Sequence, residues 1–284
     1  MKKPLKITLI SILAFLLLAG VTLTLIYLLR PKGQRRDEID VAPNENAYID
    51  DNTKNIIDCS PTESLFILAN NLKKTNYYSS AITGEVDAGG IYKQTIGGEK
   101  YRSGESFLYV SRSTSWLKKT ANQIFIENGT VLVRNGDADT NVYEDTAAKY
   151  TLIEYLNEYG TDCRELTNYE LNESTIKSAE LVSESDGIYT YRYEINVETA
   201  VDAYRVNMYK MGGLSELPTF YKSTLEVSMT ENFMPVSVKQ IDEYTVNMFL
   251  TLNCRSSITE RFEKLNDDSV VIPEYEFFGE KLVG

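Results

Sequence analysis

The chain has 284 residues, with 41 acidic and 29 basic side chains, a net charge of −12 and no histidine. The missing histidine removes the side chain that most often acts as a general base or as a metal ligand. All acidic residues follow Arg36, so the long remainder of the chain is strongly acidic. A surface of this sign has no electrostatic attraction for nucleic acid, and we exclude nucleic acid as a partner.

The N-terminal 29 residues are dominated by one apolar run. No charged residue occurs from Ile7 to Leu29, and a helix of this length would be roughly 35 Å long, enough to cross a hydrocarbon core of about 30 Å. Secretory signals have a shorter apolar region and a small residue three places before the cut, where Leu18 stands here. Val21 cannot be acylated, because acylation needs a thiol. We therefore predict an uncleaved transmembrane signal anchor over 1–29.

Three further parts follow in chain order. Residues 30–60 are polar, contain two prolines and lack periodicity, as is typical of a tether. Residues 61–262 form the predicted domain, and 263–284 form a C-terminal tail. With the anchor, this division predicts a single-pass protein of a bacterial cell membrane, whose C-terminal domain is extracytoplasmic.

Three helices are predicted in the domain. In "SPTESLFILANNLKKT", Ser60 can cap the helix, Pro61 suits its first position and Glu63 completes a capping box, so we expect a helix over 62–74. The second helix is expected over 146–159, with Gly160 as its stop. The third is expected over 197–211.

Between and after these helices the pattern is typical of antiparallel strands. Asn128-Gly129 and Asp186-Gly187 have the chemistry of tight hairpin turns. "TLEVSM" and "VSVKQI" alternate around the turn "TENFMP", and one long strand is expected from Tyr244 to Cys254. The fold class is therefore predicted as α+β, an N-terminal transmembrane helix followed by an antiparallel β half-barrel or meander with about three packed helices.

Motifs that could carry chemistry are incomplete. Ser115 and Lys118, like Ser174 and Lys177, have the spacing of a serine acyl-enzyme, but the partner motifs of that class are missing. The acidic loop that begins at Asp137 lacks the glycine and the final glutamate of a calcium loop. We predict no catalytic residue, no metal ligand and no cofactor, and therefore no enzyme.

A row of tyrosines and the cysteines leave alternatives open. Tyr189, Tyr191 and Tyr193 share one face of a predicted strand, where they could stack on a ligand or form the core side of a sheet. The three cysteines form no C-x-x-C pair. Either Cys163 and Cys254 form a disulfide and leave Cys59 as a thiol, or all three are unbridged. The residues that would face a ligand stay unknown at this stage.

The order of these elements resembles a known superfamily. A leading amphipathic helix, an antiparallel meander, inserted helices and the segment "STLEVSMTENFMPVSVKQID" are together similar to the LolA/LppX lipoprotein-carrier-like fold, over roughly residues 62–262. The resemblance implies an incomplete barrel whose concave side can hold lipid or acyl chains. It thus predicts a membrane-anchored, extracytoplasmic binding protein of the bacterial envelope that holds a lipid or other apolar ligand. One alternative is an envelope sensory or assembly module that acts through protein–protein contacts, and a degenerate hydrolase is another.

Overall fold

The computed structural model describes Thr22, Thr24, Leu28 and residues 33–38, 41–51, 53–116, 119–247, 250–273 and 282–283. Among these residues, no helix is both long and apolar enough to cross a membrane. The longest α-helix in the described part has 14 residues, whereas about 20 are needed for a span. The predicted fold class is therefore wrong in its transmembrane element, and the run over 7–29 lies outside the described residues except for three positions.

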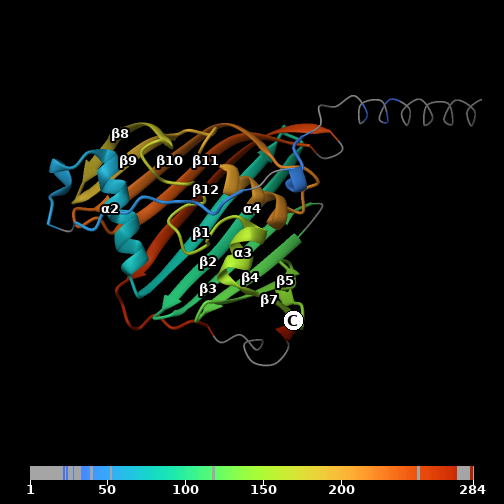
Figure 1. Cartoon of the computed structure of the whole chain (residues 1–284), viewed down its shortest axis with the longest axis horizontal. Coiled ribbons are helices and arrows are strands. Elements are labelled where there is room, and N and C mark those ends of the chain that lie inside the picture. The colour runs from blue at the N-terminus through green and yellow to red at the C-terminus, as the bar shows by residue number, and fades with distance from the viewer. Residues whose placement is uncertain are drawn as a thin grey trace, which may run out of the picture.

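The described strands form one 13-stranded sheet (Figure 1). Its order is β13-β7-β5-β4-β3-β2-β1-β12-β11-β10-β9-β8, and β6 pairs with β5. All pairings are antiparallel except the short pairing of β13 with β7. In chain order the strands are β1 (Tyr77–Ala88), β2 (Tyr92–Ser103), β3 (Ser106–Ser115), β4 (Lys119–Glu127), β5 (Thr130–Asp137), β6 (Val142–Tyr143), β7 (Ala147–Thr151), β8 (Ile176–Ser185), β9 (Ile188–Ile195), β10 (Thr219–Thr230), β11 (Pro235–Asn247), β12 (Thr251–Leu265) and β13 (Leu282–Val283).

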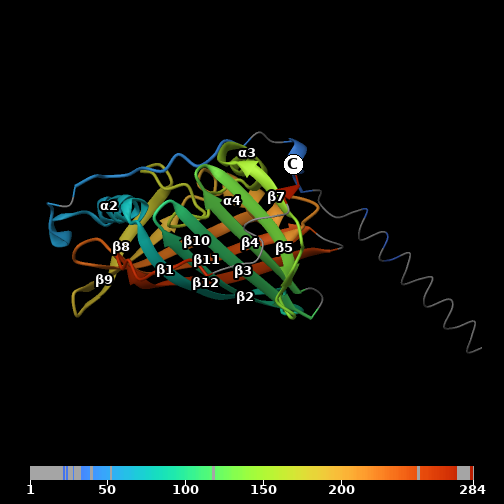
Figure 2. The same cartoon turned by 90° about the horizontal axis from the view of Figure 1, so that it is seen from below.

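Three α-helices lie on one side of the sheet. They are α2 (Pro61–Lys74), α3 (Leu152–Tyr159) and α4 (Asp202–Gly212), and two short 3-10 helices, η1 (Arg36–Glu38) and η2 (Ile56–Asp58), precede them. Figure 2 shows that the sheet curves into a trough and that the helices lie over its concave side. The side that faces away from the helices is the convex side.

Helix α2 begins where the sequence predicts. Ser60 is the N-cap, its hydroxyl accepts a hydrogen bond from the backbone N–H of Glu63 at 3.2 Å, and Pro61 occupies the first turn. The reciprocal half of the capping box is replaced, because the Glu63 carboxylate binds Lys54. Residues 64–72 of α2 are all buried, so packing around the whole middle of the helix adds to the cap in fixing it.

The second helix is shorter than predicted. Residues 147–151 form strand β7, and α3 starts only after Thr151. Thr151 and Glu154 make a complete capping box, which fixes the start there. Gly160 ends the helix with φ of 82°, and a Cβ at this position would meet the carbonyl oxygen of Ala203 at 2.2 Å. Glycine is required here both for the left-handed backbone and for the close approach of α4.

Two other predicted elements, the third helix and the last long strand, have different bounds in the structure. The third helix begins at Asp202, five residues later than predicted, and ends at Gly213 in the left-handed conformation. The long strand expected from Tyr244 to Cys254 is divided by a turn into β11 and β12. Across this hairpin Tyr244 pairs with Cys254, so the apolar alternation is real but belongs to two strands.

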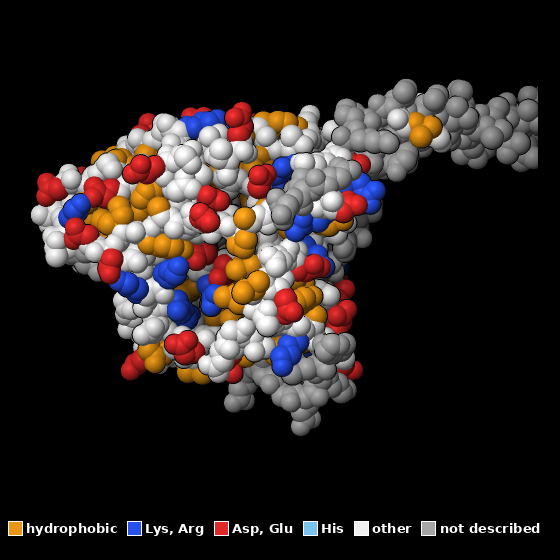
Figure 3. Space-filling view, viewed as in Figure 1, with side chains coloured by type: hydrophobic (Ala, Val, Ile, Leu, Met, Phe, Trp, Pro, Cys, Tyr) orange, Lys and Arg blue, Asp and Glu red, His pale blue; other side chains and the backbone are white. Residues whose placement is uncertain are grey.

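The concave side of the sheet is filled by a single apolar core. Side chains of α2, of the segment that follows α3 and of α4 interlock with inward residues of nearly every long strand. The largest fully buried side chains are Tyr78, Tyr155, Tyr169, Tyr193, Phe107 and Phe233. The space-filling view of this side shows further hydrophobic side chains in the middle of the face, between scattered acidic and basic groups (Figure 3).

Residues 41–51 lie extended across the helix-covered side (Figure 1). The backbone N–H of Ala47 donates to Leu171 O at 2.7 Å, and that of Ile49 donates to Phe66 O at 3.3 Å. The Tyr48 hydroxyl donates to Glu165 at 2.7 Å. This part of the predicted tether is therefore bound to the domain and adds to the cover of the concave side.

Candidate functional site on the concave side

Buried polar groups interrupt the apolar core at the centre of the sheet. Asp242 on β11 is fully buried and accepts hydrogen bonds from the hydroxyls of Tyr169 at 2.5 Å, Ser223 at 2.6 Å and Ser256 at 3.3 Å. Tyr204 of α4 approaches the same carboxylate at 3.5 Å. Asp242 thus connects three adjacent strands to the two segments that cover them.

Burial raises the pKa of Asp242 from its ordinary value of 3.8 to about 6, although all four hydroxyls act to lower it. Burial and this carboxylate also raise the pKa values of Tyr169 and Tyr204 well above the ordinary range. The tyrosine hydroxyls of this cluster therefore stay protonated at neutral pH. A reacting molecule cannot reach this buried cluster, so the cluster does not form an active site. Its hydrogen bonds hold the covering segments on the sheet.

A second buried polar group joins β2 to β12 through β1. The Lys100 ammonium and the Glu260 carboxylate are 2.8 Å apart, and each side chain is 10% exposed. Ser80 on the intervening strand donates to the other Glu260 oxygen at 2.6 Å. The two charges thus neutralise each other within the sheet, and the ion pair links β2 to β12.

A hollow of about 560 Å³ remains open at one end of the concave side. Strands β4, β5 and β7 form one wall, and α3 with the end of α4 forms the other. Its polar lining consists of Thr120, Asn122, Asn135, Glu144, Thr146 and Lys210, and its apolar lining of Ala121, Val133, Ala148, Tyr150, Tyr159 and Met211, together with Gly136 and Gly213. The hollow therefore has a mixed lining, with amides and hydroxyls among aromatic and aliphatic groups.

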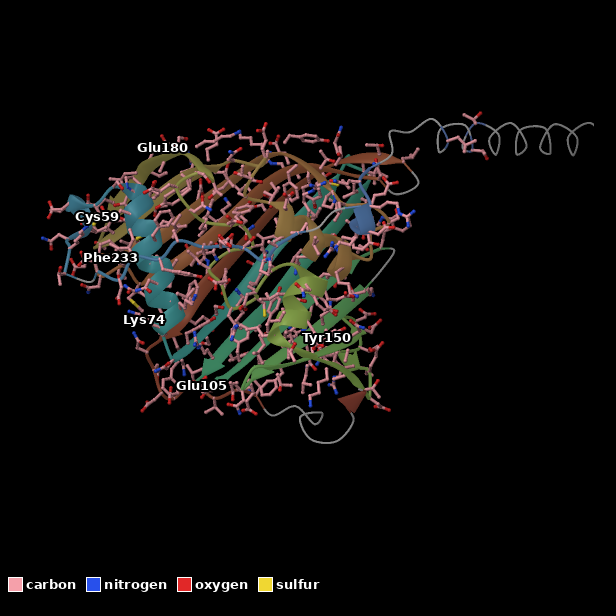
Figure 4. All side chains as sticks on the ribbon, in the orientation of Figure 1. Cys59, Lys74, Glu105, Tyr150, Glu180 and Phe233 are labelled. Atoms are coloured by element: carbon pink, nitrogen blue, oxygen red, sulfur yellow. The ribbon has the colours of Figure 1, made fainter. Side chains whose placement is uncertain are left out.

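The tyrosines of this hollow are fixed by one another. The rings of Tyr150 and Tyr159 meet edge to face at 5.9 Å, and Tyr155 stacks on Tyr159 at 4.7 Å. Figure 4 shows Tyr150 beside α3. The Lys210 ammonium lies 5.5 Å from the centre of the Tyr159 ring and pairs with Glu158. The Lys210 ammonium is therefore already paired, and the lining also contains the Glu144 carboxylate, so the hollow does not favour an anionic ligand.

Another hollow, of about 760 Å³, lies over β1, β12, β11 and β10. The residues at its surface belong to the convex side and include both signs of charge. They are Glu85, Asp87, Lys239, Glu243 and Arg255, with Tyr221, Ile241, Asn253 and Ser257. It is wider and has no cover, so it is the weaker candidate for holding a small molecule.

The structure contains no disulfide among its cysteines, and all three are thiols. Cys163 is buried near Tyr155, and burial raises its pKa to about 12. Cys254 is buried on β12 opposite Tyr244, with its pKa raised to about 11 for the same reason. Cys163 and Cys254 therefore contact different parts of the core, and the Cys163–Cys254 bridge stays a prediction that thiol labelling tests.

The other candidate residues have structural roles. Ser115 accepts a hydrogen bond from the Tyr92 hydroxyl at 2.8 Å, and Lys118 lies outside the described residues. Ser174 donates to Asn172 within a turn. Asp137 accepts backbone N–H groups from Asp139 and Thr140, so its loop closes on itself. No group of three potential metal ligands occurs in the described part of the chain.

The tyrosine row of β9 belongs to the core. Tyr191 and Tyr193 are 5% and 0% exposed, and the Tyr193 hydroxyl donates to Pro61 O at 2.8 Å. These rings pack against α2 and cannot stack on a ligand without unfolding. The core alternative from the sequence is therefore the one that the structure adopts.

Sequence reasoning missed the buried polar residues and the hollow. A signal for Asp242 exists, because it occupies an inward position of the alternating segment "VSVKQIDEY" between Gln240 and Tyr244. A carboxylate at such a position requires partners. The residues of the hollow come from β4, β5, β7, α3 and α4, and no local pattern connects them.

Comparisons with known proteins find similar structures but no related sequence. No protein-family model and no curated protein matches the sequence. The structure is similar to a LolA superfamily protein from Nitrosomonas europaea with probability 0.98, covering 73% of this chain and 93% of that one at 10% identity and a TM-score of 0.26. It also matches MucB in a complex with MucA(peri), with probability 0.44, over 72% of this chain and 94% of that one, at 7% identity and a TM-score of 0.14.

The structural match to a LolA superfamily protein covers most of the chain, in line with the resemblance that the sequence predicts. What this protein binds has to be inferred from its own residues.

Proposed function

We propose that this protein is an extracytoplasmic binding protein of the bacterial envelope that takes a small amphiphilic, lipid-like ligand into the hollow between β4–β5–β7 and α3–α4. The observation that carries the proposal is the hollow itself, about 560 Å³ in volume with both polar and apolar groups in its lining. This volume lies within the range of ligand sites in proteins, roughly 300–1,000 Å³.

The lining favours an amphiphile over a purely apolar molecule. Asn122 and Asn135 face each other across β4 and β5 and offer donors and acceptors to a polar head. Tyr150, Tyr159 and Met211 offer apolar and aromatic surface to a short tail. Since the centre of the concave side is filled, a long acyl chain has no room there, and the ligand is confined to this end.

The chemistry of the site supports binding without a reaction. The nucleophilic and carboxylate side chains of the described lining, Thr120, Thr146, Glu144 and Lys210, include no pair within hydrogen-bond distance of each other. Lys210 is bound to Glu158 instead. The proposal is therefore one of binding and includes no reaction.

A substitution that fills the hollow tests the proposal. Ala148 is exposed on β7 and lines the hollow, so Ala148→Tyr should occupy the space without disturbing the core. We expect the wild-type chain to bind a fluorescent single-chain phospholipid and Ala148→Tyr to lose at least about tenfold in affinity. The matched control is Ser183→Tyr on β8, which is also exposed on a strand and lies outside the lining. Equal binding by all three proteins, or none by the wild type, would contradict the proposal.

The edge of the sheet favours a protein partner as the second candidate. Strand β8 ends the sheet and pairs on one side only, with β9. Leu181 and Val182, at an irregularity in the register of this strand, are 50% and 44% exposed. An extended segment of a partner could add to such an edge. Crosslinking from Ser183 in intact cells should then give one discrete adduct, lost in Leu181→Lys, whereas phospholipid binding should be unchanged.

A further inference from the structure

Residues 44–50 lie in a groove on the helix-covered side of the domain. One wall of this groove is the part of α2 from Phe66 to Lys74, and the other is the segment 165–171 that follows α3. In Figure 1 the extended chain around the strap, as we call residues 44–50, crosses the face beside α2. The strap contacts both walls of this strap groove, so it shows which groups the groove recognises.

The main chain of the strap is bound as an extended peptide is bound in a recognition groove. The backbone N–H of Ala47 donates to Leu171 O at 2.7 Å, and the Leu171 N–H donates to the Asn46 side chain at 2.8 Å. On the opposite wall, the N–H of Ile49 donates to Phe66 O at 3.3 Å. Main-chain bonds of this kind give affinity in many peptide complexes, and the side chains between them give specificity.

Polar side chains of the strap contact both walls. The Glu165 carboxylate accepts hydrogen bonds from the Tyr48 hydroxyl at 2.7 Å and from the Asn46 amide at 3.3 Å. Burial and the Glu165 carboxylate raise the pKa of Tyr48, so the hydroxyl keeps the proton that it donates. From the opposite wall, the Lys73 ammonium lies 3.9 Å from the centre of the Tyr48 ring. Tyr48 therefore connects the two walls.

Charge fixes the direction in which the strap runs. Asp50 lies 2.5 Å from the ammonium of Lys74, the last residue of α2, and accepts a hydrogen bond from the Asn70 amide at 3.3 Å. Figure 4 shows Lys74 at this end of the helix. At the other end of the strap, Asn44 donates to Asn168 O at 3.1 Å. A segment bound in the opposite direction would take its carboxylate away from Lys74.

The walls of the groove are packed independently of the strap. Residues 64–72 of α2 are buried, and Tyr169 in the other wall is held on the sheet by Asp242. In contrast, every residue of the strap is at least partly exposed, and two backbone–backbone hydrogen bonds join it to the described part of the domain. Since directional polar contacts hold the strap, it can leave the groove while the walls keep their places.

We propose that the strap groove is a peptide-binding site and that residues 44–50 occupy it as an internal competitor. The partner is an extended segment of another protein that presents a carboxamide, a tyrosine and a carboxylate at alternate positions, as Asn46, Tyr48 and Asp50 do. The strap belongs to the same chain, so its effective concentration at the groove is on the order of millimolar. A partner therefore replaces it by binding more tightly or by being held close to the domain.

This site is separate from the hollow. None of the residues that contact the strap lines the hollow between β4–β5–β7 and α3–α4. Peptide binding therefore does not depend on the ligand proposed for the hollow, and failure of one proposal leaves the other unaffected.

A peptide added to the full chain tests the proposal. The probe is a fluorescein-labelled peptide with the sequence of residues 43–51, PNENAYIDD. Tyr48→Ala removes the contacts of the strap with Glu165 and Lys73, so the strap should vacate the groove more often. We expect the peptide to bind Tyr48→Ala at least about tenfold more tightly than it binds the wild type. Equal binding by the two proteins, or none by either, would overturn the proposal.

Further variants show whether the peptide binds in the groove. Adding Glu165→Gln to Tyr48→Ala removes the charged acceptor, so the affinity for the peptide should fall by about tenfold. The matched control is Tyr221→Ala, at an exposed tyrosine of β10, which should bind the peptide as the wild type does. A peptide with alanine in place of its tyrosine should bind Tyr48→Ala at least about tenfold more weakly. A peptide that binds regardless of these changes contacts another surface, which would contradict the proposed site.

Hydrogen exchange in the wild type gives a test that needs no variant. If the strap leaves the groove while the domain stays folded, the Ala47 and Ile49 amides should exchange at least about 100-fold faster than the amides of β11. Equal exchange would show that the strap opens only when the whole domain unfolds, and the proposal would fail. Dimers of the wild type that are lost in Tyr48→Ala would identify the strap of a second copy as the occupant, which would also overturn it. Thermal melting verifies that each variant is folded.

Discussion

The hydroxyl of Tyr169 donates a hydrogen bond of 2.5 Å to the carboxylate of Asp242, and both side chains are fully buried. Tyr169 belongs to the segment that follows α3, whereas Asp242 belongs to the central strand β11. This hydrogen bond therefore links the segment that covers the concave side to the sheet beneath it. Its dependence on pH gives the first prediction.

The Asp242 carboxyl should make the domain more stable at acidic than at neutral pH. Its pKa is raised from 3.8 to about 6 in the folded state, so its contribution is fully present below about pH 4 and is lost as the pH rises through about 6. The difference corresponds to about 3 kcal/mol in the free energy of unfolding. Urea unfolding at a series of pH values should show this decline in the wild type relative to Asp242→Asn. If both proteins have the same pH dependence, Asp242 is not the group responsible.

The buried pair of Lys100 and Glu260 should behave as a unit. Lys100→Met leaves the Glu260 carboxylate buried without its partner, which should lower the free energy of unfolding by about 3–5 kcal/mol. The double variant with Glu260→Met removes both charges and should recover most of this loss. A double-mutant cycle measured by urea unfolding checks the coupling. Additive losses would mean that the two groups do not depend on each other.

The cysteines should all be available for labelling once the chain is unfolded. Burial raises the pKa values of Cys163 and Cys254 and keeps them unreactive in the native state, whereas Cys59 is partly exposed. Maleimide should therefore label Cys59 first, and three thiols after unfolding without a reductant. Mass spectrometry counts the labels. A single label under these conditions would indicate the Cys163–Cys254 bridge.

Local signals in the sequence predicted some elements well. Ser60 and Pro61 mark the start of α2, and a helix forms there because the cap and the apolar face agree. Gly160 marks the end of α3 through its left-handed backbone. The same kind of signal was present but overlooked at Thr151 and Glu154, which form the complete capping box of α3. A helix that is predicted to begin after Thr151 is also compatible with a strand over residues 147–151.

Long-range features could not be predicted in this way. The partners of Asp242 come from residues 169, 204, 223 and 256, and only the strand register brings them together. The hollow likewise exists only because α3 and α4 lie over β4, β5 and β7.

The last prediction concerns how full the concave side is at its centre. Phe107 and Tyr109 both point inward from β3, opposite Ile126 and Ile124 of β4. Phe107 is 1% exposed and its ring lies 6.4 Å from that of Tyr78. Since the surrounding side chains are apolar and closely packed, Phe107→Ala should lower the free energy of unfolding by about 3–5 kcal/mol.

Phe107→Asp should unfold the domain outright, because the carboxylate would be buried with no partner. The matched control, Leu181→Asp on the exposed edge strand β8, should stay folded. Circular dichroism and thermal melting distinguish these outcomes. If Phe107→Asp instead folds and only loses bound lipid, the centre of the half-barrel is an open cavity that admits water, and the ligand site proposed at the β4–β5–β7 end would have to be extended into it.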